Sequence, residues 1–296
     1  MSSTISDIEQ LEYFRELIQP YTKRKEKRLF ITQYLSGAGN ELSSHFWSSV
    51  SSSRLAYDLY SWMKDEENVL DLQFEFHLPG LKSGGEGPNM DVFIETKDEL
   101  VFIESKFTEV ANLHYIDNGY LKKGYYDKEG YGRHNMPLEE RFYNLGFSEL
   151  FSRFCYKIEE IITTRGRKKT DSVDWFEPKQ ETCHLLGILF FLFDEKNLDR
   201  IKGKKIRLLN IYWRMPNDSE STLAVEFKKE ANNLISSIKD TTNCPFYDFE
   251  FDYFSIQDLL EDNSKLSTAI TFPYGLSESI EKRNSAIVGE QPRGRI

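Results

Sequence analysis

The sequence predicts a single α/β domain, a mixed central sheet flanked by helices. Apolar residues follow a helical spacing over residues 8–18 and 41–63, and from residue 69 they alternate with polar residues as in a strand. Two further runs, 91–95 and 100–107, are rich in branched and aromatic residues and are joined by a short polar segment, as in a β-hairpin. With 296 residues, 39% of them hydrophobic, the chain can bury a sizeable core.

The elements of the first part of the chain follow from these patterns. The helix over residues 41–63 would bury one side of its surface, carrying Leu42, Phe46, Val50, Leu55, Leu59 and Met63. The next element is expected to be a half-buried strand whose inward residues are Leu70, Leu72, Phe74 and Phe76. Residues 79–88 are rich in glycine and proline, which predicts a loop before the hairpin.

The second part alternates between the two periods. Helices are expected over 138–162, from Pro178 to Leu189 or beyond, and over 227–238, with strands over 206–213 and 246–254. We therefore expect one domain over residues 1–275, with a helical insertion at about 110–175. Residues 276–296 are expected to form a flexible C-terminal tail that is dispensable for the fold.

Composition excludes several classes of protein. Acidic residues outnumber basic ones 48 to 38, for a net charge of −10, which argues against a generally basic surface for nucleic acid or anionic membrane. The longest apolar run, Leu185–Phe193, is far shorter than the roughly 20 residues that span a bilayer. Three cysteines without a CxxC spacing argue against a disulfide framework or a zinc ribbon. We expect a cytoplasmic protein with no membrane partner.

The hairpin holds the residues that indicate chemistry. With its turn centred between Lys97 and Asp98, Asp91 faces Glu104, and Lys106 points the same way. Directly opposed side chains have Cβ atoms about 4.5–5.5 Å apart, where like charges are destabilising. A divalent cation between the two carboxylates would remove that penalty, and oxygen ligands without cysteine suit Mg²⁺ or Mn²⁺.

This pattern, Asp91 followed by Glu104-Ser105-Lys106, resembles the signature of the PD-(D/E)XK nuclease superfamily, whose fold is restriction endonuclease-like. The chain departs from that signature because Met90, and not a proline, precedes Asp91. The resemblance implies that Asp91, Glu104 and the carbonyl of Ser105 bind Mg²⁺ or Mn²⁺. It also implies that Lys106 orients or deprotonates the attacking water.

By the same resemblance, two residues outside the hairpin join the site. Glu41 would supply an acid from the helix before the sheet, and Gln180 a polar group from the helix after it. His184, which has apolar neighbours, is expected to be a core histidine or to lie behind the ligands. The implied activity is endonucleolytic hydrolysis of phosphodiester bonds with DNA as the expected partner. Homodimerisation and further partner subunits are left open.

Two alternatives stand beside the nuclease hypothesis. The same fold could be a non-catalytic module that binds nucleic acid or protein, or the acid pair could be surface decoration on an unrelated α/β interaction protein. Phosphate contacts would come from basic clusters, each of which is also compatible with an ordinary solvated loop. These clusters are residues 23–28, 122–123, 165–169 and 202–207. Tyrosines interleaved with lysines between 115 and 133 could stack on bases or pack an insertion.

Overall fold

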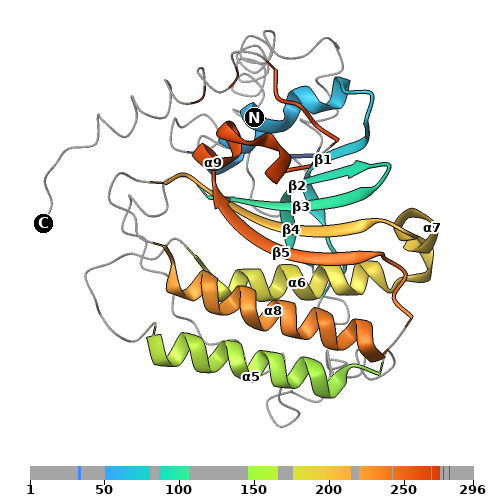
Figure 1. Cartoon of the computed structure of the whole chain (residues 1–296), viewed down its shortest axis with the longest axis vertical. Coiled ribbons are helices and arrows are strands. Elements are labelled where there is room, and N and C mark those ends of the chain that lie inside the picture. Colours follow the sequence, from blue (N-terminus) through green and yellow to red (C-terminus); the bar gives the residue numbers. More distant parts are fainter. Residues whose placement is uncertain are drawn as a thin grey trace, which may run out of the picture.

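A mixed β-sheet forms the centre of the molecule (Figure 1). The structure is a computed structural model, and it describes residues 33–34, 51–80, 87–106, 146–165, 176–214, 220–241, 243–267, 269–273, 276 and 280. The five strands lie in chain order and are β1 (Val69–His77), β2 (Asn89–Thr96), β3 (Glu99–Lys106), β4 (Lys205–Tyr212) and β5 (Asp248–Ser255). The β1–β2 and β2–β3 pairs are antiparallel, whereas β3–β4 and β4–β5 are parallel. The predicted α/β class is therefore confirmed.

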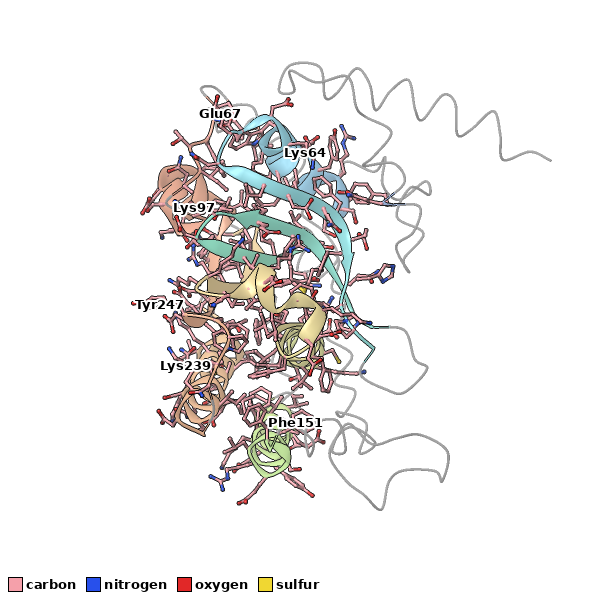
Figure 2. The ribbon with its side chains drawn as sticks, turned by 90° about the vertical axis from the view of Figure 1, so that its right-hand side faces the viewer. Lys64, Glu67, Lys97, Phe151, Lys239 and Tyr247 are labelled. Carbon is pink, nitrogen blue, oxygen red and sulfur yellow. The ribbon has the colours of Figure 1, made fainter. Side chains whose placement is uncertain are left out.

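Helices cover both faces of this sheet. In Figure 1, α6 and α8 lie beneath the sheet with α5 beyond them, while α3 and α9 lie on the opposite side. In the view turned by 90°, Phe151 marks α5 at the end of the molecule away from the sheet (Figure 2). The helices are α3 (Ser52–Tyr60), α5 (Ser148–Arg165), α6 (Pro178–Leu192), α7 (Leu198–Ile201), α8 (Thr222–Thr241) and α9 (Ile256–Glu261), with 3-10 segments at Ser61–Asp65, Glu195–Asn197 and Asn263–Lys265. None of these described helices combines the length and apolar character that crossing a membrane requires.

The hairpin strands send side chains into two separate cores. One core lies under α3 and α9 and includes the four residues predicted to share an apolar face, Val92, Ile94, Val101 and Ile103. The other lies between the sheet and the helices α5, α6 and α8, and it includes Phe93, Leu100 and Phe102. Because both faces of the hairpin are covered, the strands are apolar on both sides along most of their length.

Strand β1 departs from the predicted alternation. Leu70 is 60% exposed, and Phe74 and Phe76 belong to opposite cores although they were expected to share a face. The cause lies between the two phenylalanines, where Glu75 has a φ of 52°. This backbone conformation turns the side chains that follow to the other face of the sheet. A non-glycine residue in this left-handed region costs about 1–3 kcal/mol, so the surrounding structure must hold it there.

Helix α6 is the element that spans the sheet over the candidate site. It begins with Pro178 in its first turn, where the missing N–H costs nothing, and most of its residues are buried, as expected for a helix apolar on nearly all sides. Gly187 lets this helix pack closely against Leu78 and Pro88, since an added Cβ would lie 3.0 Å from Leu78 Cβ and from Pro88 Cγ. The helix predicted from Pro178 is therefore confirmed.

The other predicted elements agree with the structure where it describes them. Leu55, Leu59 and Met63 are buried as expected, but α3 begins at Ser52, where the Ser51 side chain accepts a hydrogen bond from Arg54 N at 3.2 Å. The predicted strands correspond to β4 and β5. The helix predicted over 227–238 is α8, and the one predicted over 138–162 corresponds to α5, described from Ser148. The helix at 8–18, residues 41–50 and most of the insertion at 110–175 lie outside the described residues.

Part of the segment expected to be a tail belongs to the core. Leu276 is fully buried and Ile280 is 3% exposed, and both pack in the core under α3 and α9. The packed domain therefore includes residues beyond the expected boundary at 275. The rest of the 276–296 segment lies outside the described residues.

Gly87 closes the loop that leads into β2. Leu78 N donates a hydrogen bond to Pro88 O at 3.0 Å, and a Cβ at Gly87 would lie 1.8 Å from Leu78 O. Because backbone must move to relieve that clash, we expect Gly87→Ala to lower the free energy of unfolding by about 1–3 kcal/mol or more. Urea denaturation followed by circular dichroism measures this, and an unchanged midpoint would contradict the close approach.

Candidate active site

The β2–β3 hairpin brings Asp91 and Glu104 to the same end of the sheet. The predicted register is confirmed from Val92, which pairs with Ile103, to Ile94, which pairs with Val101. Beyond Val92 the ladder ends, and the carboxylate of Asp91 replaces the backbone as a partner. Asp91 Oδ2 accepts a hydrogen bond from Ser105 N at 2.7 Å, so the acid is tied to β3 directly beside Glu104.

Glu104, Lys106 and Gln180 form one polar cluster. Lys106 Nζ lies 2.8 Å from Glu104 Oε1 and donates to Gln180 Oε1 at 2.7 Å. Gln180 Nε2 in turn donates to Glu104 Oε1 at 2.7 Å. The side chains of Glu104 and Lys106 are only 5% and 13% exposed, so the charges face each other in a restricted space. Three of the side chains named from the sequence therefore meet.

The fold explains why a residue of α6 reaches the hairpin. Glu104 shares its side of β3 with Leu100 and Phe102, whose side chains lie in the core beneath α6. Gln180 lies in the first turn of α6, and the helix starts above the end of β3. Packing of α6 against these apolar residues therefore positions the Gln180 amide over Glu104 and Lys106.

A buried polar chain continues behind Glu104. His184 Nε2 lies 3.8 Å from Glu104 Oε2, and His184 Nδ1 lies 3.8 Å from Glu181 Oε1. Asn210 Nδ2, on β4, donates to Glu181 Oε1 at 2.6 Å. Glu181 and Asn210 are fully buried and His184 is 2% exposed. The position of His184 matches the prediction of a core histidine behind the candidate ligands.

Two carboxylates control the pKa of this histidine. Burial, the largest influence, lowers the pKa of His184, but the negative charges of Glu104 and Glu181 outweigh it, and the net shift is upward. Within the described part of the chain, Glu181 Oε2, His184 Nδ1 and Asn210 Oδ1 have no hydrogen-bond partner. Sequence reasoning missed Glu181 and Asn210, because only the parallel register of β3 and β4 brings Asn210 opposite Glu104.

Among the described residues, more negative than positive side chains act on Asp91. Burial raises the pKa of Asp91 well above its usual range, and the charges of Glu104 and Glu75 raise it further. Lys106 and the hydrogen bond from Ser105 N oppose this shift without cancelling it. Glu75 was not predicted to join the site, because its polar position in β1 resembles those of Asp71 and Gln73.

The donor chemistry of the site fits a hard divalent cation. Carboxylate oxygens are the ligands that Mg²⁺ and Mn²⁺ prefer, and a cation would compensate the charge that raises the pKa of Asp91. Among the described residues no three His, Cys, Asp or Glu side chains already form a metal-binding group. Glu104 Oε1 is engaged by Lys106 and Gln180, so binding would use Oε2 or displace these groups.

The remaining candidates fall into two sets. Glu41 and the basic or tyrosine-rich segments at 23–28, 115–133 and 166–169 lie outside the described residues. The basic cluster at 202–207 was a candidate either for phosphate contacts or for an ordinary solvated loop, and the structure places it at the end of the sheet opposite Lys106. There Lys204 pairs with Glu95, and Lys205 and Arg207 pair with Glu250.

Comparison of the chain with protein-family models, curated proteins and solved structures gives no match. Function is therefore inferred from the arrangement of Asp91, Glu104, Lys106 and Gln180.

Proposed function

We propose that the chain is a metal-dependent nuclease with a restriction endonuclease-like core, acting on phosphodiester bonds of DNA. The observation that carries this proposal is the contact of Lys106 with both Glu104 and Gln180, with Asp91 held beside them. A lysine enclosed between a carboxylate and an amide, next to a second carboxylate, resembles the arrangement implied by the PD-(D/E)XK signature. Cytoplasmic location is part of the same proposal.

Each residue has a distinct role in the proposed reaction. Asp91 and Glu104 would hold Mg²⁺ or Mn²⁺, with the Ser105 carbonyl as an additional oxygen. The cation supplies water activation and neutralises charge on the phosphate oxygens. Lys106 orients the attacking water and stabilises the negative charge that develops on the phosphate. Gln180, which bonds both Lys106 and Glu104, keeps these two groups at a fixed separation.

Calorimetric titration of the full-length protein with Mn²⁺, combined with cleavage of plasmid, single-stranded DNA and RNA, tests this proposal. We expect saturable binding by the wild type and cleavage of at least one DNA substrate. Asp91→Asn keeps an oxygen that can accept from Ser105 N but removes the charge. Its Mn²⁺ affinity should fall by at least roughly tenfold, which corresponds to about 1.4 kcal/mol, and cleavage should be lost.

Asp98→Asn is the matched control, because Asp98 is an exposed carboxylate in the turn at the other end of the same hairpin. It should bind and cleave like the wild type.

The ionised form of Asp91 is disfavoured in the folded protein, so stability falls as pH rises between the ordinary pKa of this group and its raised value. Asp91→Asn should therefore melt no lower than the wild type at neutral pH.

Failure of the wild type to bind Mn²⁺, with or without DNA, would favour the non-catalytic binding module.

A further inference from the structure

The carboxyl ends of the three parallel strands meet at the edge of the sheet that holds the candidate site. Lys106, the last residue of β3, pairs with Tyr212 at the end of β4, and Tyr212 pairs with Ser255 at the end of β5. Open α/β sheets bind their ligands outside the carboxyl ends of their strands. A substrate that reaches Lys106 is therefore expected to extend over the residues that follow β4 and β5.

Arg214 follows β4 at this edge of the sheet. Trp213 N donates a hydrogen bond to Lys106 O at 2.9 Å, so the chain continues beside β3 as far as Trp213. Neighbouring strands lie about 4.8 Å apart and rise about 3.3 Å per residue, which places the Cα atoms of Lys106 and Arg214 about 8 Å apart. The side chain of Arg214 is 44% exposed. Its guanidinium group and the candidate site are therefore within reach of one extended polyanion.

Hydrogen bonds to both the backbone and the side chain hold Arg214 in place. Its backbone N donates to Gln257 Oε1 at 3.1 Å, and its backbone O accepts from Gln257 Nε2 at 2.9 Å. Its Nη2 donates to Ser255 Oγ at 2.6 Å and to Asp258 Oδ1 at 2.5 Å. Nε and Nη1 donate to none of the residues that the structure describes. The guanidinium group is thus oriented in advance, with part of its fork of N–H groups left for a ligand.

The ion pair with Asp258 does not by itself account for this arrangement. Exposed ion pairs contribute little to stability, because water screens the charges and two side chains must be ordered. Asp258 Oδ2 also accepts from Ser255 N at 3.1 Å and from Ser255 Oγ at 2.7 Å, so Asp258 stabilises the start of α9 without Arg214. A planar guanidinium group held at one nitrogen can donate two parallel hydrogen bonds to a phosphate through the others.

We propose that Arg214 binds a phosphate group of DNA that flanks the scissile one, and that it orients the strand across the carboxyl edge of the sheet. This inference rests on the proposed function and deepens it, because it names a substrate contact outside the residues that carry the reaction. Nε and Nη1 donate to the phosphate oxygens while Ser255 and Asp258 keep Nη2. A contact to the backbone fixes the position of the strand without reading its bases.

Fluorescence anisotropy of the full-length protein with labelled single-stranded and duplex DNA in EDTA tests this contact without metal or cleavage. Arg214→Gln removes the charge, so we expect roughly tenfold weaker binding and a salt dependence (log K against log salt) whose slope is smaller by about one. Arg214→Lys keeps the charge and loses the fork, so the slope should stay and the affinity should fall less. In Mn²⁺, Arg214→Gln should raise the KM for cleavage with kcat nearly unchanged, because the contact is the same before and during the reaction.

Lys239→Gln is the matched control. Lys239 forms a similarly exposed ion pair with Asp248 at 2.8 Å, at the opposite end of the sheet, where Asp248 pairs with Lys205. It should bind DNA with the affinity and salt dependence of the wild type.

The outcomes separate this inference from the proposed function. Wild-type affinity and salt dependence in Arg214→Gln would overturn the role of Arg214 and leave the nuclease proposal standing. An equal loss in Lys239→Gln would also overturn it, because overall charge would then explain the result. A lower melting temperature of Arg214→Gln with an unchanged salt slope would show a merely structural role. A wild type that neither binds nor cleaves DNA would overturn both proposals.

Discussion

Lys106→Met is expected to reduce phosphodiester cleavage by about 10²–10⁴-fold while Mn²⁺ binding is retained or becomes tighter. Lys106 Nζ lies 2.8 Å from Glu104 Oε1 and 2.7 Å from Gln180 Oε1, so its ammonium group is held within the candidate site. Without it, no ammonium group orients the water or stabilises charge on the phosphate. Glu104 simultaneously loses a competing cation, which favours metal binding. Single-turnover cleavage assays and Mn²⁺ calorimetry measure the two effects separately.

Lys97→Met provides the matched control for this experiment. Lys97 is exposed in the turn between β2 and β3, at the opposite end of the hairpin from Lys106, and it is labelled in Figure 2. The control should cleave at the wild-type rate, and both variants should show cooperative thermal unfolding. Full activity in Lys106→Met would remove the lysine from the mechanism. An equal loss in both variants would indicate a general electrostatic effect on DNA binding.

The hairpin could be predicted in detail because its information is local. The short polar turn sets the pairing of Val92 with Ile103, and alternation then determines which residues share a face. The same reasoning failed for β1, where the apolar and polar residues alternate in the sequence but Phe74 and Phe76 enter opposite cores. A positive φ at Glu75 has no signal in the sequence, because such a conformation is normally associated with glycine or asparagine.

The candidate site was predictable only where a motif or a helix start pointed to it. Glu104 and Lys106 lie in one motif, and Gln180 lies in the first turn of a helix whose beginning Pro178 marks. Glu181 and Asn210 are brought together by the order and register of parallel strands that are distant in the chain. No local pattern encodes that register, so the polar chain behind Glu104 required the structure.

The role of the basic cluster at 202–207 was also not predictable from the sequence, because it depends on the same strand register. Its charges were compatible with phosphate binding or with an ordinary loop, and composition could not separate the two. The parallel register of β3 and β4 pairs Lys205 with Glu99, whereas Lys106 pairs with Tyr212 at the other end. The cluster is therefore remote from the candidate site along the strands, and Lys204 and Lys205 instead form ion pairs within the protein.

Glu95→Ala tests this structural role and should lower the free energy of unfolding by about 3–5 kcal/mol. Lys204 Nζ lies 2.6 Å from Glu95 Oε1 and also donates to Thr96 O at 2.8 Å. Arg200 contacts the other oxygen of Glu95, and its guanidinium lies 4.7 Å from the ring centroid of Phe93. Removing Glu95 leaves the buried Lys204 ammonium without its carboxylate. Guanidinium denaturation measures the change.

Asp248→Ala is the comparison, because Asp248 pairs with Lys239 at a site where the two side chains are 43% and 37% exposed. Such a pair contributes at most about 1 kcal/mol, so this variant should remain close to the wild type. The double variant Glu95→Leu/Lys204→Met should regain much of the lost stability, since apolar residues remove the unpaired charge. Mn²⁺ affinity should stay unchanged in all three, because these ion pairs lie at the end of the sheet opposite Asp91. Loss of metal binding in Glu95→Ala without loss of stability would show that the two ends are coupled, and that the cluster at 202–207 serves more than the fold.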